Sequence, residues 1–263
     1  MSKALHLLVV AASAAAVSSD AFAQETTLLA ESFSYAAGSL TSVSGGTWVA
    51  HSGTNSNPVQ VNGAGAAVLR GGSAEDVNRP LGPALLTAGT LYASFTVDFS
   101  SGTLAATGVS TYFLHFKDAS TGFRGRVFVG SATVADADLF RLGIENDGSD
   151  GAATVSYSGN LDRTAPHQVT VAYDLGLGTS RLWVNTPVTG PATAEDTVAG
   201  AAIAGVSSIA LRQGGNATST GNYSGLQVDN LTVVHQTTVI PEPSTWALAI
   251  AGVVVLGWAS RRR

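Results

Sequence analysis

The stretch Leu91-Tyr92-Ala93-Ser94-Phe95-Thr96-Val97-Asp98-Phe99 decides the fold class of this chain. Its odd positions are all apolar, whereas most of its even positions are polar. Successive side chains of a β-strand point to opposite faces, so this period of two is typical of a half-buried strand. The stretch therefore predicts a strand with one face in a core and the other toward solvent.

Similar short runs recur along the body of the chain, at 112–116, 126–129, 140–145, 155–157, 169–173, 182–184, 209–211 and 227–234. Turn-forming residues separate them, as in Asn146-Asp147-Gly148. Val169 to Val184 is typical of a hairpin, and Pro187 to Ala202 of a long surface loop. Many short strands at this spacing predict an all-β fold, either an antiparallel sandwich or a barrel.

Composition limits the classes of function. The 263-residue chain has no cysteine, which excludes cysteine catalysis, cysteine-based zinc sites and iron–sulfur clusters within it. Residues 24–242 hold nine basic against seventeen acidic residues. This acidic balance argues against nucleic acid as a partner. About 219 residues are enough for one sizeable β domain with its own core.

The N-terminus has the pattern of a secretory signal peptide. Lys3 supplies a small positive charge, Ala4 to Val17 is an apolar stretch, and Ala21-Phe22-Ala23 is an A-x-A cleavage site. We expect residues 1–23 to be a signal helix that signal peptidase removes after Ala23, so that the mature chain starts at Gln24. The β domain is then expected over residues 24–236.

The C-terminus, residues 237–263, contains a second apolar segment with a different character. The run from Trp246 to Ala259 has no charged residue and ends before Arg261-Arg262-Arg263. As a helix it would be about 21 Å long, short of the roughly 30 Å of a hydrocarbon core. The flanking tryptophans favour a membrane interface, and the arginines favour the cytoplasmic side. We expect a short transmembrane helix over 245–260 that contacts the membrane transiently.

This C-terminal pattern resembles the PEP-CTERM sorting signal of Gram-negative bacteria. The resemblance rests on Pro241-Glu242-Pro243, the apolar span and the terminal arginines, in that order. It implies recognition by an exosortase, a membrane protease or transpeptidase, with Pro241, Glu242 and Pro243 as a substrate site. It also implies cleavage near the motif and delivery from the inner membrane to the cell surface or the extracellular polysaccharide.

The body is similar to the concanavalin A-like, laminin-G-like sandwiches found in PEP-CTERM proteins. The similarity begins at Glu31 to Leu40, which looks like their first strand, and ends at Gln227 to Thr232, which looks like their last. It covers most of residues 28–235 and implies an antiparallel jelly-roll β-sandwich. Such a fold is often used to recognise carbohydrate, but the fold alone does not establish a function.

Motifs for catalysis are missing from the sequence. Glycosidases need two carboxylates at a fixed separation, which on one strand face places acidic residues two apart. Asp136 and Asp138 have this spacing, but their alanine neighbours fit a solvated loop. No nucleophile elbow, phosphate loop or paired histidine ligand is present, and His115 is expected on the surface side of its strand. We expect a protein that is not an enzyme.

Two kinds of ligand site have candidate residues. The loop from Glu145 to Gly151 is rich in oxygen ligands, so Asp147 and Asp150 are candidates for calcium, although the same residues suit an ordinary turn. Trp48, Trp183 and Tyr223 are candidates for stacking on a sugar. Trp183 alternates with Leu182 and Val184, so its side chain either points outward or lies in a core on the other face of the sheet.

The sequence thus leaves three functional hypotheses. The first is an exported structural or adhesive protein of the cell surface, the extracellular polysaccharide or the biofilm. The second is a lectin-like carbohydrate-binding module with a defined glycan. The third is an enzyme acting on surface polysaccharide, which the missing carboxylate motif disfavours.

Overall fold

The computed structural model describes residues 22–239, except 55, 73–74, 106, 147–154, 199–202 and 214–222. The chain divides into one compact unit at 25–237 and a second made of residues 1–24 and 238–263. The calcium candidates Asp147 and Asp150, the predicted signal and transmembrane helices, and Pro241-Glu242-Pro243 therefore lie outside the described residues, as do Ala21 and the terminal arginines. Within the described part no helix is long and apolar enough to cross a membrane.

The described residues form two antiparallel sheets. Sheet A runs in the order β16-β15-β14-β7-β18-β5-β4-β2, with β1 and β8 also paired to β18. Its strands are β1 Phe22–Glu31, β2 Gly38–Ser39, β4 Gln60–Val61, β5 Ala67–Arg70, β7 Thr90–Asp98, β8 Thr103–Leu104, β14 His167–Asp174, β15 Thr179–Val184, β16 Ala194–Asp196 and β18 Tyr223–Val239.

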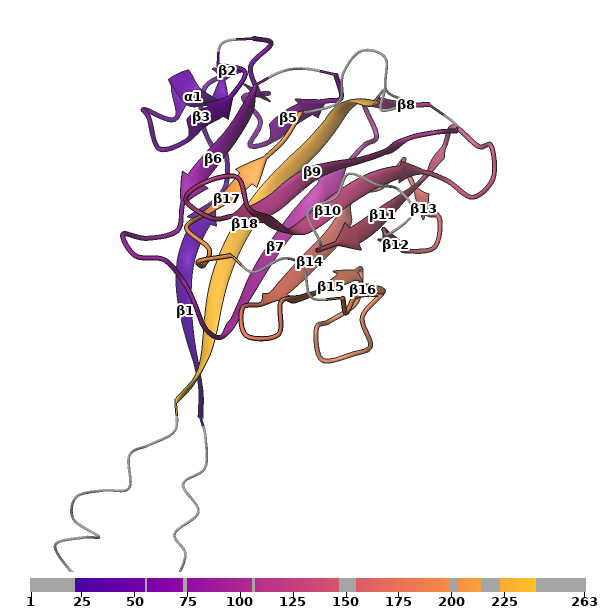
Figure 1. Ribbon diagram of the computed structural model, residues 1–263. Helices are drawn as coiled ribbons and strands as arrows, with labels where there is room; N and C mark the ends of the chain where they lie inside the picture. Colours follow the sequence, from indigo (N-terminus) through magenta and orange to yellow (C-terminus); the bar gives the residue numbers. More distant parts are fainter. Residues whose placement is uncertain are drawn as a thin grey trace, which may run out of the picture. The chain divides into compact units, whose positions relative to one another are not determined.

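Sheet B runs in the order β12-β11-β10-β9-β17-β6-β3, with β13 paired to β11. Its strands are β3 Val49–Ser52, β6 Asp76–Pro80, β9 Ser110–Lys117, β10 Phe123–Ser131, β11 Leu139–Glu145, β12 Ser156–Tyr157, β13 Leu161–Asp162 and β17 Ser208–Leu211. The one helix among the described residues is the single turn α1 Leu40–Val43. The predicted all-β antiparallel sandwich is confirmed, and Figure 1 shows its two layers.

The core lies between the sheets, and β7 shows how the sequence builds it. The apolar residues of β7 are at most 1% exposed, while the residues between them are half-buried on the other face. Phe95 meets Phe113 of sheet B edge-to-face, with ring centroids 6.3 Å apart. Burying side chains of this size contributes roughly 1.5–3 kcal/mol each, so the two facing rows hold the layers together.

The predicted hairpin is confirmed as β14 and β15. Val169 pairs with Val184 and Asp174 with Thr179, and the chain reverses through a turn in which the Asp174 carboxylate accepts the backbone N–H of Gly176. In β15, Leu182 and Val184 belong to the core. Trp183 between them lies on the outer face of sheet A.

Bulges in two strand pairs change which face the side chains take. In β18 the register shifts between Asp229 and Thr232, where Asn230 has a positive φ of 53°. The bulge explains why Val228, Leu231 and Val233 are all buried, although simple alternation would separate them. In the β9–β10 pair the register shifts twice, between Arg124 and Val127, where Gly125 has a φ of 56°, and between Val127 and Phe128.

Two sequence predictions about local structure are wrong. Residues Glu31–Leu40 are not the first strand, because β1 ends at Glu31. The Glu31 carboxylate accepts hydrogen bonds from the Phe33 backbone, the Tyr35 hydroxyl and the Trp48 indole, and it pairs with Arg79. These contacts hold the chain in a turn. Residues Pro187–Ala202 are not loop throughout, because β16 pairs with β15 inside this range.

Candidate functional site: a groove on the outer face of sheet A

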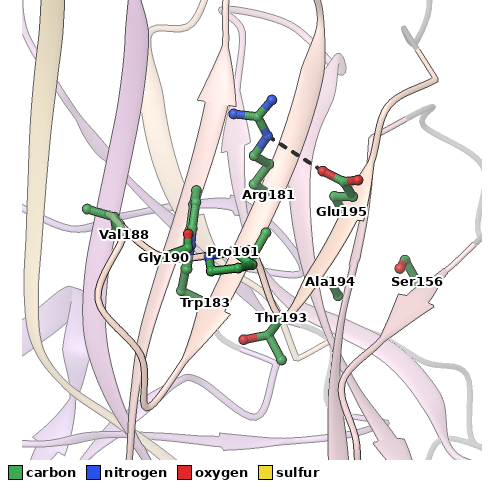
Figure 2. A pocket seen from close by; sticks show the side chains of 10 residues that line it. Ser156, Arg181, Trp183, Val188, Gly190, Pro191, Thr193, Ala194 and Glu195 are labelled. Carbon is green, nitrogen blue, oxygen red and sulfur yellow. Dashed lines mark hydrogen bonds and ion pairs between the residues drawn. The ribbon is translucent and has the colours of Figure 1, made fainter.

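Three depressions lie on the outer face of sheet A or at its β16 edge. The largest has a volume of about 550 Å³ and lies beside β15 and β16, lined by Ser156, Arg181, Trp183, Val188 and 190–195. Figure 2 shows these side chains. A small one of about 50 Å³ includes Tyr92, Arg181 and Trp183, and a third of about 220 Å³ includes Tyr92 and Val188.

The three depressions share lining residues and are therefore neighbours, and together we call them the sheet A groove. The first and second share Arg181 and Trp183, the second and third share Tyr92, and the first and third share Val188. The groove crosses the strands from β16 to β18 and reaches Glu25 of β1. At about 4.8 Å between neighbouring strands, its length is roughly 24 Å.

Trp183 forms part of the wall of the groove. Of the two orientations that the alternation left open, the structure has the outward one, since Trp183 is not part of the core cluster. Its exposed fraction is nevertheless only 5%, because the segment from Val188 to Thr193 folds beside the ring, as Figure 2 shows. The indole N–H donates to the Gly190 carbonyl at 3.0 Å. The ring is thus held in one orientation.

Tyr92 is the second aromatic side chain of the groove, and the sequence reasoning missed it. It is half-buried and lines two of the three depressions. Through the register, Trp183 lies beside Thr170 and Thr170 beside Ser94, two residues from Tyr92. The two aromatic residues are therefore about 12 Å apart along the face. The sequence feature that could have identified Tyr92 is an aromatic residue at one of the polar, outward-facing positions of an alternating strand.

Polar groups surround the two rings. Arg181 and Glu195 pair across β15 and β16 at 3.7 Å, with side chains 56% and 54% exposed. The hydroxyls of Ser94 and Thr170 are hydrogen-bonded at 2.9 Å, and Gln236 donates to Glu25 at 3.1 Å. Hydroxyl, amide, guanidinium and carboxylate groups beside aromatic rings can bind polyhydroxylated ligands, which need many donors and acceptors.

The other aromatic candidates are buried, and the expectation that they stack on a sugar is corrected. Tyr223 is 2% exposed, packs edge-to-face on Phe99 at 6.3 Å and donates to the Arg212 carbonyl at 3.4 Å. Burial raises the pKa of its phenol. Trp48 is fully buried and stacks on Phe33 at 5.7 Å. Both rings belong to the core, where a sugar cannot reach them.

The carboxylates predicted from sequence have structural roles where they are described. Asp136 accepts the backbone N–H of Asp138 at 2.9 Å in an exposed turn between β10 and β11. In the described part of the chain, no group of three or more His, Asp or Glu side chains could hold a metal ion. His115, expected on the surface, faces away from the core but is fully buried among other aromatic rings.

Comparisons with solved structures identify similar folds. The chain resembles Rv0315, an immunostimulatory antigen and pseudo β-1,3-glucanase of Mycobacterium tuberculosis, at 13% identity and a TM-score of 0.50, covering 80% of this chain and 99% of that one. The VIP36 exoplasmic/lumenal domain, in its Ca²⁺/Man2-bound form, aligns at 10% identity and a TM-score of 0.44, covering 83% and 91%.

A sialidase aligns at 14% identity and a TM-score of 0.46, covering 77% of this chain but only 18% of the sialidase. At these identities the likenesses show the fold alone. No curated protein sequence matches the chain.

The model of the PEP-CTERM protein-sorting motif matches residues 239–263. The match includes Pro241-Glu242-Pro243, the apolar run and the terminal arginines, so the resemblance stated from the sequence is confirmed. Such a motif indicates export, transit through the membrane and processing by an exosortase. The chain therefore carries a PEP-CTERM protein-sorting motif, which marks a protein for export, after an antiparallel β-sandwich.

Proposed function

We propose that this protein is an adhesive component of the cell surface or the extracellular matrix, and that its sandwich binds polysaccharide in the sheet A groove without chemical conversion. The observation that carries the proposal is the groove itself, in which the half-buried ring of Tyr92 is open to a sugar and the covered ring of Trp183, about 12 Å away, stiffens the wall. Polar groups on the same face supply the hydrogen bonds that sugar hydroxyls require.

The shape of the groove favours an extended chain over a single sugar. Its length of roughly 24 Å exceeds any one monosaccharide, and its polar groups are spread along it. Binding at several weak subsites along one polymer raises the overall affinity through effective concentration. Exposed ion pairs such as Arg181–Glu195 contribute little to stability, so they are free to exchange partners with a ligand.

The proposed maturation of the protein involves both ends of the chain. Signal peptidase removes residues 1–23, the sandwich over 24–236 folds after export across the inner membrane, and the 237–263 segment holds it at that membrane through residues 245–260. The exosortase then acts near Pro241-Glu242-Pro243, and the domain reaches the surface or the extracellular polysaccharide. Retention in the exopolysaccharide or biofilm by the groove gives the adhesive role.

A glycan array probed with the mature protein tests the proposal. We expect binding to an extended polysaccharide, and we expect Tyr92→Ser to weaken it at least tenfold because the ring stacks on a sugar face. Trp183→Ala would leave a cavity behind the wall of the groove, so Tyr92→Ser is the variant that tests stacking itself. Leu177→Ser, at a 65% exposed turn residue, is the control. An array without any bound glycan, or equal binding by Tyr92→Ser, would refute the proposal.

Catalysis and calcium have separate tests. Release of reducing ends from matrix polysaccharide by the wild-type protein would show an enzyme and contradict the binding role proposed here. We also propose calcium as the cation of the Glu145–Gly151 loop, through Asp147 and Asp150. A calorimetric titration with calcium that gives no heat and no thermal shift would exclude it.

A further inference from the structure

The smallest depression of the sheet A groove adjoins both of the others. It shares Arg181 and Trp183 with the largest depression and Tyr92 with the third. Its volume is about 50 Å³, and its other lining residues are Thr90, Ala172, Asp174 and Thr179. We call it the Ala172 pocket. A polysaccharide that lies along the groove passes over this pocket, so its size and chemistry decide which substituent of a sugar can enter.

Strand register places two walls and the floor of the Ala172 pocket in one row across sheet A. Arg181 of β15 pairs with Ala172 of β14, and Ala172 pairs with Tyr92 of β7. The arginine and the tyrosine are therefore two strands apart, roughly 10 Å between their backbones. Only the methyl group of Ala172 lies between them in this row, and it is 6% exposed. A small residue at this position is thus the reason that the pocket exists.

The Ala172 pocket has one free acceptor and one free donor. Oδ1 of Asp174 accepts the turn N–H groups of Gly176 and Leu177 at 2.9 and 2.8 Å. No group among the described residues donates to its Oδ2. The Arg181 side chain is 56% exposed, and its ion pair with Glu195 is long, at 3.7 Å, as Figure 2 shows. Both charged groups can therefore turn to a ligand.

The size of the Ala172 pocket suits a substituent of a sugar and not a sugar ring. One water molecule needs roughly 10–15 Å³ of such space, so a volume of about 50 Å³ takes about four non-hydrogen atoms. A hydroxyl group supplies one such atom and would leave most of the pocket to water. An acetamido group supplies four, namely the nitrogen, the carbonyl carbon, the carbonyl oxygen and the methyl carbon.

The chemistry of an acetamido group matches these walls. Its N–H can donate to Asp174, its carbonyl can accept from Arg181, and its methyl group can lie on Ala172. A free ammonium group would lie beside the Arg181 guanidinium on an apolar floor, where repulsion and loss of hydration both oppose it. Sugars with a carboxylate are opposed as well, because Glu25, Asp174 and Glu195 outnumber the one arginine among the described lining residues.

We propose that the polysaccharide of the sheet A groove contains N-acetylamino sugars, and that the Ala172 pocket recognises their acetamido group. This inference rests on the proposed function, because it names the class of sugar that the groove selects. The sugar ring lies on Tyr92, and the acetamido group enters the pocket between Tyr92 and Arg181. Asp174 then accepts the amide N–H, while Arg181 donates to the carbonyl.

Three hexasaccharides with the same β-1,4-linked backbone are matched probes, because they differ only in the group on carbon 2. They are cellohexaose, with a hydroxyl, the glucosamine hexamer, with an ammonium, and the N-acetylglucosamine hexamer. We expect calorimetry on the mature protein to give a dissociation constant of about 1 mM or tighter for the acetylated hexamer. The other two should bind at least tenfold more weakly. Nuclear Overhauser effects should join the acetyl methyl protons to the Tyr92 ring.

A variant that fills the pocket separates it from the rest of the groove. Ala172→Val should weaken binding of the acetylated hexamer at least tenfold and leave binding of cellohexaose unchanged, because its added methyl groups occupy the space of the acetamido group. The control Gln168→Val lies on the same strand and the same face but lines none of the three depressions, and it should bind like the wild type. Thermal unfolding checks that both variants are folded.

The outcomes also distinguish this inference from the proposed function. Equal binding of the three hexamers, tightest binding of the glucosamine hexamer, no binding of the acetylated hexamer, or an Ala172→Val protein that binds like the wild type would each overturn the acetamido pocket. A glycan array that still shows another bound polysaccharide would then leave the proposed function intact. An array without any bound glycan would overturn both.

Discussion

The buried ion pair between Arg126 and Glu145 allows a quantitative prediction about stability. Both side chains are fully buried, and the guanidinium and carboxylate are 2.7 Å apart. With an effective dielectric constant near 20, their attraction is about 6 kcal/mol before the cost of desolvation. Replacing Glu145 by leucine removes the carboxylate from a buried guanidinium that lies over two aromatic rings. We expect this change to lower the free energy of unfolding by about 3–5 kcal/mol.

The double variant separates the ion pair from other effects. Arg126→Met combined with Glu145→Leu removes both charges, so its cost should be much smaller than the sum of the single costs. A favourable coupling energy of about 2–3 kcal/mol is expected in the double-mutant cycle. Urea unfolding, followed by circular dichroism on the two single variants, the double variant and the wild type, measures it.

The exposed pair Arg181–Glu195 serves as the matched control. These residues also face each other on neighbouring strands, but their side chains are more than half exposed and 3.7 Å apart. Their coupling energy should lie between about 0 and 1 kcal/mol. A coupling energy for Arg126–Glu145 as small as that of the control would refute the reasoning, since it would mean that water reaches the ion pair.

Three further predictions concern the bulge, the histidine and the two ends of the chain. Gly125→Ala should lower the free energy of unfolding by roughly 1–2 kcal/mol, because φ is 56° and the added Cβ would lie 3.1 Å from Phe116. The control Gly176→Ala, in an open turn, should change the stability little, and equal effects of the two variants would contradict the assigned bulge. The pKa of His115 is below 6.5 in the folded state, so the unfolded chain binds the proton first as the pH falls. The contribution of His115 to stability is therefore fully present above pH 6.5 and decreases below it, by at most about 1.4 kcal/mol per pH unit. In urea unfolding measured at several pH values, the free energy of unfolding should depend less steeply on pH in His115→Leu than in the wild type, and equal dependence would rule this out. The intact mass of the protein recovered from host cells and medium should correspond to a start at Gln24 and loss of the apolar tail; a mass that retains the tail would mean a permanent anchor.

The sequence predicts those parts of this protein that depend on neighbouring residues. Alternation in β7 predicted both the strand and its buried face, since the pleat fixes the direction of each side chain. The hairpin of β14 and β15 followed from two alternating runs and a glycine-rich turn. The sorting motif is a linear signal that a partner recognises in the chain, and it was fully visible in the sequence.

Only the tertiary structure decided which side chains are accessible. The alternation left two faces open for Trp183, and the segment that covers it comes from a connection between strands. Tyr223 begins the last strand, and its burial depends on Phe99 and Arg212, more than ten residues away in the chain. Burial is a property of the packed layers, so alternation cannot distinguish a covered outer face from an open one.

The packing of two guanidinium groups on the Tyr112 ring could not be predicted from the sequence, for the same physical reason. Two register shifts between β9 and β10, one of them at Gly125, place Arg126 beside Tyr112, and the partner carboxylate of Arg126 comes from another strand. Arg212 reaches the ring from β17, about a hundred residues further along the chain. Local sequence patterns determined the strands and the sorting signal of this protein, whereas strand order and register decided which charged groups and aromatic rings meet on its two faces.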